Sequence, residues 1–209
     1  MNKSIWLLVG LLIAIVLISG CAGQNKESST QSQSSLETNI SNVTVPEQPK
    51  NLTLSQIIIQ PNEVANDGYI LDSRGERSKS EIDQASLDKG WKEGYFANFK
   101  QEKGTSSIEI VMSKYPESSM SILIAEIKAD CKGTDIGTDI YGSYSVEYEL
   151  MSSPFTDSVI CKATATYPDS SVIRYFHLQF VKKDVYTYIK GPDQEIIENL
   201  ANIMRNRIW

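Results

Sequence analysis

The chain is poor in histidine and cysteine and has no excess of basic residues. Its 209 residues include one His and three Cys, and 20 Lys or Arg stand against 26 Asp or Glu, which gives a net charge of −6. A single histidine excludes multi-histidine metal sites, and three cysteines exclude a dense disulfide scaffold. The negative charge disfavours nucleic acid as a partner, because a phosphate backbone needs a basic surface.

Catalytic signatures are also absent. The sequence contains no G-x-S-x-G, Walker A, G-x-G-x-x-G, H-E-x-x-H or C-x-x-C pattern. Asp130, Asp135 and Asp139 carry oxygen ligands of the kind that Ca²⁺ prefers, but their spacing fits no EF-hand, and we interpret them as a solvated acidic stretch. We therefore expect no enzyme, no cofactor and no metal; the alternative is a cell-envelope enzyme without a recognisable motif.

No hydrophobic run is long enough for an ordinary membrane span. The residues from Ile5 to Ile18 are apolar except for Gly10, a length typical of a signal peptide and short of the roughly 20 residues that a spanning helix needs. The run ends in Ile18-Ser19-Gly20-Cys21. This sequence resembles the lipobox of prokaryotic lipoproteins, which implies cleavage before Cys21, a diacylglycerol on its thiol and a palmitate-type membrane anchor.

The alternative to the lipoprotein is an uncleaved helix that anchors the chain, with Cys21 at the membrane edge. Both interpretations place the rest of the chain outside the cytoplasm, attached to the cell membrane, and they differ only in the anchor. We favour residues 1–20 as a signal peptide, because the apolar core itself is too short to span a bilayer.

Residues 21–54 are rich in Ser, Thr, Asn and Gln and poor in apolar residues, so they are predicted to form a flexible tether. Asn39, Asn42 and Asn51 each begin an N-x-Ser/Thr sequon and are candidate glycosylation sites. Chance placement in a segment so rich in Ser and Thr also explains part of this pattern. The sequons favour an archaeal source, where surface N-glycosylation is common.

Residues 55–209 carry the hydrophobic patterning of one α+β domain. We expect a largely antiparallel β-meander packed with about three helices. The predicted helices are a short one before Gly90, one from Pro116 to Gly133 and one after Asp193; the predicted strands are 91–100, 108–112, 144–151, 159–167, 172–181 and 185–189. The stretch from Thr134 to Ser143 is predicted to be irregular.

The order of these elements resembles that of extrinsic photosystem proteins of the PsbP-like type. This weak resemblance implies an α/β/α sandwich and no activity. The segment from Asp88 to Tyr95 is similar to segments of archaeal surface lipoproteins, which imply no activity either.

His177 and the tyrosines are the remaining candidates for a site. His177 is predicted to share a strand face with Tyr175 and to be structural, with catalysis or pH sensing as the less favoured hypotheses. Seven of the ten tyrosines lie between Tyr141 and Tyr188. Ordinary half-buried sheet positions explain this, and a binding face is the alternative.

Cys131 and Cys161 remain as an even pair once Cys21 is used by the anchor. Both are predicted to point into one layer between helix and sheet, so we expect a disulfide; the alternative is two buried free thiols. Taken together, the sequence predicts a lipid-anchored extracytoplasmic protein with a binding or structural role. Its expected partners are the membrane, through the N-terminal lipid, and a surface protein or small ligand that the sequence does not identify.

Overall fold

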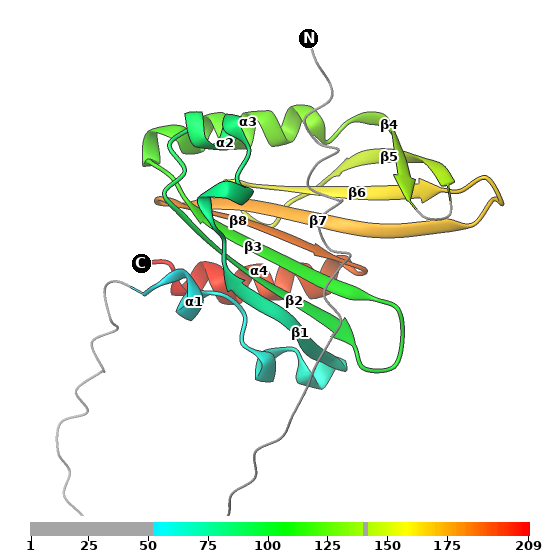
Figure 1. Ribbon diagram of the computed structural model, residues 1–209, viewed down its shortest axis with the longest axis horizontal. Coiled ribbons are helices and arrows are strands. Elements are labelled where there is room, and N and C mark those ends of the chain that lie inside the picture. Colours follow the sequence, from blue (N-terminus) through cyan, green and yellow to red (C-terminus); the bar gives the residue numbers. More distant parts are fainter. Residues whose placement is uncertain (1–51, 140–141) are drawn as a thin grey trace, which may run out of the picture. The chain divides into compact units, whose positions relative to one another are not determined.

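The computed structural model describes residues 52–139 and 142–209 (Figure 1). Its strands are β1 (Tyr69–Glu76), β2 (Glu93–Gln101), β3 (Ser107–Lys114), β4 (Gly133–Asp139), β5 (Gly142–Met151), β6 (Ser158–Thr166), β7 (Val172–Lys182) and β8 (Val185–Gly191). Its α-helices are α1 (Leu54–Ile57), α2 (Gln84–Asp88), α3 (Met120–Asp130) and α4 (Gln194–Arg207). Short 3₁₀ turns span Pro61–Glu63, Ala65–Asp67, Lys79–Glu81 and Glu117–Ser119.

The eight strands form one antiparallel sheet in the order β1-β2-β3-β8-β7-β6-β5-β4. Two meanders meet at the centre, where β3 pairs with β8. Helix α3 connects β3 at the centre to β4 at the far edge, and the chain then returns strand by strand to β8. This arrangement confirms the predicted α+β class and the largely antiparallel meander.

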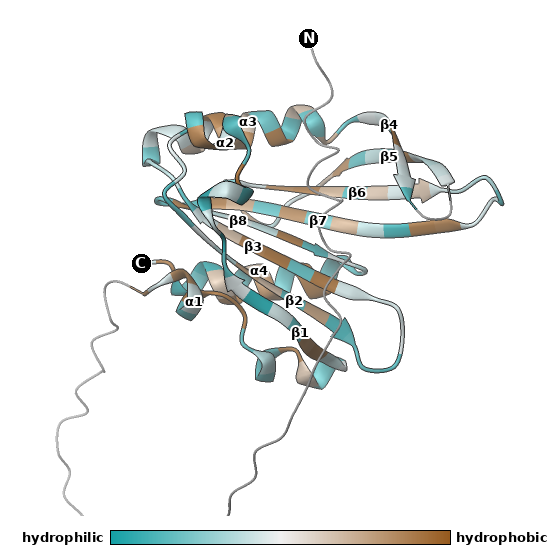
Figure 2. Cartoon of the chain, in the orientation of Figure 1, coloured by the Kyte–Doolittle hydropathy of each residue, from teal (hydrophilic) through white to brown (hydrophobic). Residues whose placement is uncertain are grey.

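Helices α3 and α4 lie on opposite faces of the sheet (Figure 1). Phe180 and Val181 are neighbours on β7, so their side chains point to opposite faces. Phe180 packs in the core with α4, and Val181 packs with Met120 and Leu123 of α3. Figure 2 shows both hydrophobic and hydrophilic positions along β6 and β7.

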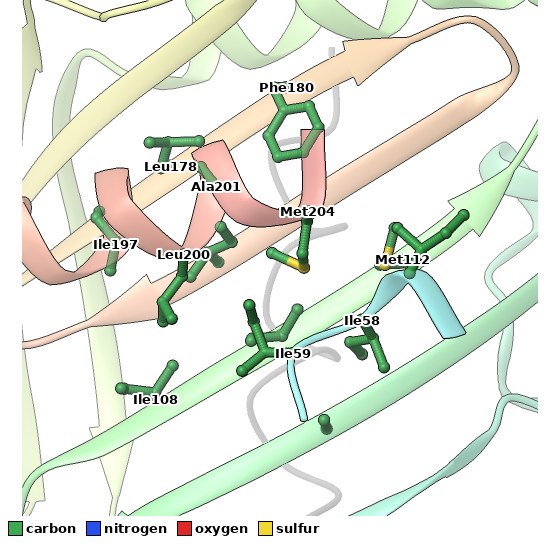
Figure 3. Close-up of a cluster of buried hydrophobic side chains, with 14 of the residues drawn as sticks. Ile58, Ile59, Ile108, Met112, Leu178, Phe180, Ile197, Leu200, Ala201 and Met204 are labelled. Carbon is green, nitrogen blue, oxygen red and sulfur yellow. The ribbon is translucent and has the colours of Figure 1, made fainter. Parts of the chain in front are cut away.

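The largest part of the core lies between α4 and the sheet (Figure 3). Asp193 caps the start of helix α4, and its carboxylate accepts hydrogen bonds from the backbone N–H groups of Glu195 and Ile196 at 2.8 and 3.2 Å. The helix buries one apolar face against the sheet, as the sequence predicts. The buried side chains on this face of the helix are Ile197, Leu200, Ala201 and Met204.

The segment before β1 closes the same core. Leu54, Ile58 and Ile59 are buried in it, so the core includes Leu54, the residue at which the predicted tether ends. Arg207 of α4 holds this segment in place by donating to the carbonyl oxygens of Ile57 and Ile58 at 3.1 and 3.3 Å and by pairing with Glu63.

Two strands lie where the sequence analysis predicts none. Strand β1 was not predicted, and its pairing with β2 shifts by one residue between Leu71 and Ser73, which breaks the alternation of side chains that marks a strand. Strand β4 occupies most of the stretch predicted to be irregular. It pairs with β5 at the sheet edge and leaves Ile136 72% exposed, so it carries little apolar patterning.

Candidate functional site

The face of the sheet opposite α4 has a covered part and an open part. Helix α3 covers one end, where it packs on Val159, Val181 and the two cysteines. Beyond α3 the aromatic side chains of this face are only half-buried. We call this open part the tyrosine face and define it as Tyr144, Tyr148, Tyr167, Tyr175, His177 and Tyr188.

Strand pairing brings these side chains together. Tyr148 of β5 and Tyr175 of β7 both pair with Ala163 of β6, which lies between them. Ala163 is fully buried, and its small side chain leaves room for the two rings above it. The pairing of β7 with β6 places His177 opposite Cys161, and the pairing of β7 with β8 places it opposite Lys190.

The rings contact one another in two groups. Tyr144 stacks on Tyr167 with 4.8 Å between ring centroids, and the Tyr167 hydroxyl donates to a carboxylate oxygen of Asp139 at 2.8 Å. In the second group, His177 stacks on Tyr175 at 5.0 Å and meets Tyr188 edge-on at 5.4 Å. Such contacts fix ring orientation and add to the stability gained by burial.

A glycine makes the first group possible. A Cβ atom on Gly137 of β4 would lie 2.3 Å from the Tyr144 ring. The Tyr144 ring therefore lies directly over the backbone of the edge strand, in space that any other residue would fill.

The His177 side chain is half-buried, but one of its ring nitrogens is buried. Its Nε2 atom is inaccessible to solvent and has no hydrogen-bond partner among the described residues. Burial, with a smaller contribution from the nearby Lys190 charge, lowers the pKa of His177 to about 3. The imidazole is thus neutral at physiological pH.

The hydroxyls of Tyr148, Tyr175 and Tyr188 also stay uncharged. Burial raises the pKa of Tyr175, and the neighbouring tyrosines and Glu109 add to this shift. Burial, followed by Glu109, raises the pKa of Tyr188 well above its ordinary value, and burial does the same to a smaller degree for Tyr148. Each hydroxyl can therefore both donate and accept hydrogen bonds.

One ion pair lies beside His177. Lys190 of β8 and Glu109 of β3 are directly opposite each other and their charged atoms are 3.0 Å apart. The ammonium group of Lys190 also lies 5.2 Å from the centre of the Tyr175 ring, a cation–π distance. Sequence reasoning did not single out this pair, since its members are far apart in the chain and no local motif marks them.

The structure places the other candidate residues as follows. Cys131 and Cys161 form a disulfide with their Cα atoms 5.6 Å apart, within the range that a bridge requires. Asp130 ends α3, whereas Asp135 and Asp139 lie on β4, and the described residues include no group of three or more potential ligands placed to hold a metal. Cys21, Asn39, Asn42 and Asn51 lie outside the described residues.

An acidic pocket of about 290 Å³ lies on the α4 side, at the start of that helix. Its carboxylates come from Glu63, Asp67, Asp193 and Glu195. Two of them already have structural partners, because Asp193 caps α4 and Glu63 pairs with Arg207. The tyrosine face is therefore the better candidate site.

Within residues 52–139 and 142–209, the structure contains no helix of the length and apolarity that a bilayer crossing requires.

No protein-family model matches the sequence, and no curated protein matches it. Among solved structures, the chain is similar to the extracellular domain of PknH from Mycobacterium tuberculosis. The TM-score is 0.59 at 10% sequence identity, and the match covers 74% of this chain and 94% of that domain. At this identity the likeness establishes a shared fold.

Proposed function

We propose that this protein is a lipid-anchored, extracytoplasmic binding protein that recognises its ligand with the tyrosine face. The observation that carries the proposal is the open part of the sheet: six aromatic side chains remain half-buried beside a part that α3 covers. Tyrosine suits such a surface, because its ring buries a large area at low entropic cost and its hydroxyl stays available for hydrogen bonds.

The fold and the disulfide support a location outside the cytoplasm. The structural neighbour is an extracellular domain, and disulfides persist mainly in oxidising compartments. A lipid on Cys21 would hold the domain at the cell membrane through the residues before Leu52. The net charge of −6 supports a ligand other than nucleic acid.

We propose binding without catalysis. His177 is the one histidine of the chain, and a pKa near 3 makes its imidazole a weak base at neutral pH. Its ring packs between Tyr175 and Tyr188, so its contacts are those of a side chain that positions its neighbours.

The lipid anchor can be tested at Cys21. The Cys21→Ser variant is expected to keep residues 1–20, because signal removal at a lipobox requires the modified thiol. Mass spectrometry of the N-terminus would show a lipidated chain beginning at Cys21 in the native protein and a chain beginning at Met1 in the variant. A native protein that begins at Met1, or at a residue other than Cys21, would rule out the lipid anchor.

Chemical modification of tyrosine tests the binding face before the ligand is known. If the face is occupied in the cell envelope, Tyr144, Tyr167 and Tyr175 should be nitrated several-fold more slowly on intact cells than in the purified full-length protein. Tyr95 is the internal control, since it is half-buried on β2 and its side chain packs with the core on the α4 side. Nitration of the face and of Tyr95 at the same relative rates in both samples would contradict the proposal.

A further inference from the structure

The chemistry of the tyrosine face narrows the class of ligand. Its fixed charges are balanced at the centre, where Glu109 and Lys190 neutralise each other. The side chains of both residues are about one-third exposed, at 31% and 32%, so a ligand can reach them. The central pair offers no net charge to a phosphate group, and Asp139 beside Tyr167 and Asp135 near Tyr148 add negative charge at the β4 edge that repels one.

A row of polar side chains crosses the centre of the sheet beside the tyrosine rings. Asn98 of β2 is directly opposite Glu109, which is opposite Lys190, which is opposite His177. This row contains an amide, a carboxylate and an ammonium group, and the rings of Tyr175 and Tyr188 lie on His177. The face therefore combines flat apolar surfaces with donors and acceptors at their edges.

His177 orders the rings at the centre of this face. A buried polar atom normally has a hydrogen-bond partner, and an unpartnered one costs about 1–3 kcal/mol. The unpartnered Nε2 belongs to the ring that contacts both tyrosines, on the residue that lies opposite Lys190. Because this nitrogen is inaccessible to solvent, His177 acts on a ligand through the two tyrosine rings that it contacts.

We propose that the tyrosine face binds a neutral carbohydrate. A sugar ring has an apolar face of C–H groups that can stack on Tyr175 or Tyr188, and its hydroxyl groups both donate and accept. Glu109 and Asn98 would accept from or donate to these hydroxyls, Lys190 would donate to them, and His177 is a positioning residue that holds the two tyrosine rings. This inference rests on the proposed binding function and names its ligand class.

Binding can be measured with the full-length protein in a detergent that carries no sugar headgroup, because a maltoside would compete for the face. The protein is applied to an array of neutral, acidic and basic glycans, and affinities for the neutral glycans that bind are then measured by calorimetry. Tyr175→Leu should weaken binding by about tenfold or more, as expected for an aromatic residue at the centre of an interface. Glu109→Gln should weaken it by a similar factor.

Glu149→Gln is the matched control. Glu149 and Lys162 form the same kind of cross-strand ion pair, 3.0 Å apart, on β5 and β6. Glu149 is adjacent in sequence to Tyr148 of the tyrosine face, so its side chain points to the other side of the sheet. This variant should bind neutral glycans as tightly as the wild type does. Any weaker binding that it shows would measure the effect of breaking a surface ion pair away from the tyrosine face.

The outcomes separate the ligand class from the binding function. Neutral-glycan binding that Tyr175→Leu and Glu109→Gln weaken, and Glu149→Gln does not, would support the proposal. Binding restricted to acidic or basic glycans, equal loss in all three variants, or no glycan binding would overturn it. If the tyrosines are nevertheless protected from nitration on cells, the face binds another class of ligand, such as a surface protein, and only the carbohydrate inference fails.

Discussion

Replacing Cys131 and Cys161 together by alanine is expected to lower the free energy of unfolding by about 3.5 kcal/mol. The bridge closes a loop of 30 residues, and closing such a loop removes chain entropy from the unfolded state by about that amount. The disulfide also links the end of α3 to β6, and both cysteines pack there with Ile127 and Val159. Loss of the bridge should therefore weaken the attachment of α3 to the sheet.

Denaturant titrations followed by circular dichroism measure this loss. The oxidised wild type, the wild type unfolded and refolded under reducing conditions, and the double alanine variant form one series. The reduced wild type should be nearly as unstable as the variant, which separates the effect of the bridge from that of two smaller side chains. Two free thiols in the unreduced, unfolded domain would contradict the disulfide itself.

Helices α3 and α4 and the central strands could be predicted because their apolar residues repeat with a clear period, whereas α1 was not predicted. Helix α4 buries Ile197, Leu200, Ala201 and Met204 along one face, and β8 alternates buried and half-buried residues along its whole length. The pattern of apolar and polar residues within each segment is enough to predict these elements. The two edge strands lack that patterning, which is why β1 and β4 needed the three-dimensional structure.

The site could be predicted only in part. The concentration of tyrosines is visible in the sequence, and so is the common face of Tyr175 and His177, because both follow from the alternation within one strand. Whether tyrosines of β5, β7 and β8 share a face depends on strand order and register. The pairing of Glu109 with Lys190 depends on the contact of β3 with β8 at the junction of the two meanders, and no local pattern encodes it.

The tyrosine face and Cys161 of the disulfide lie on the same face of the sheet. Cys161 lies directly opposite His177 in the pairing of β6 with β7, so the bridge that attaches α3 is next to the histidine that holds Tyr175 and Tyr188. The covered and open parts of this face therefore meet where Cys161 pairs with His177. Stability measurements at His177 consequently report on the centre of the candidate site.

Acidification is expected to destabilise the wild type by about 3 kcal/mol more than a His177→Phe variant between pH 7 and pH 4. Burial and then Lys190 lower the pKa of folded His177 to about 3, whereas an unfolded histidine titrates near pH 6.5. Between these values the unfolded chain binds a proton that the folded chain excludes, so stability is full above about pH 6.5 and falls as the pH falls toward 3. Phenylalanine keeps a ring between Tyr175 and Tyr188 and removes the titrating nitrogen.

Chemical unfolding of both proteins at intervals from pH 7 to pH 4 tests this difference. The titratable groups near the imidazole are Lys190 and Tyr188 from β8, Tyr175 from β7 and, through Lys190, Glu109 from β3. Glu109 is the one carboxyl group in this set. Repeating the comparison in a Glu109→Gln background removes that carboxyl group, and the difference between His177 and Phe should persist there. Parallel loss of stability in both proteins at every pH would show that folded and unfolded His177 bind protons alike, which would contradict the effect of burial on its pKa.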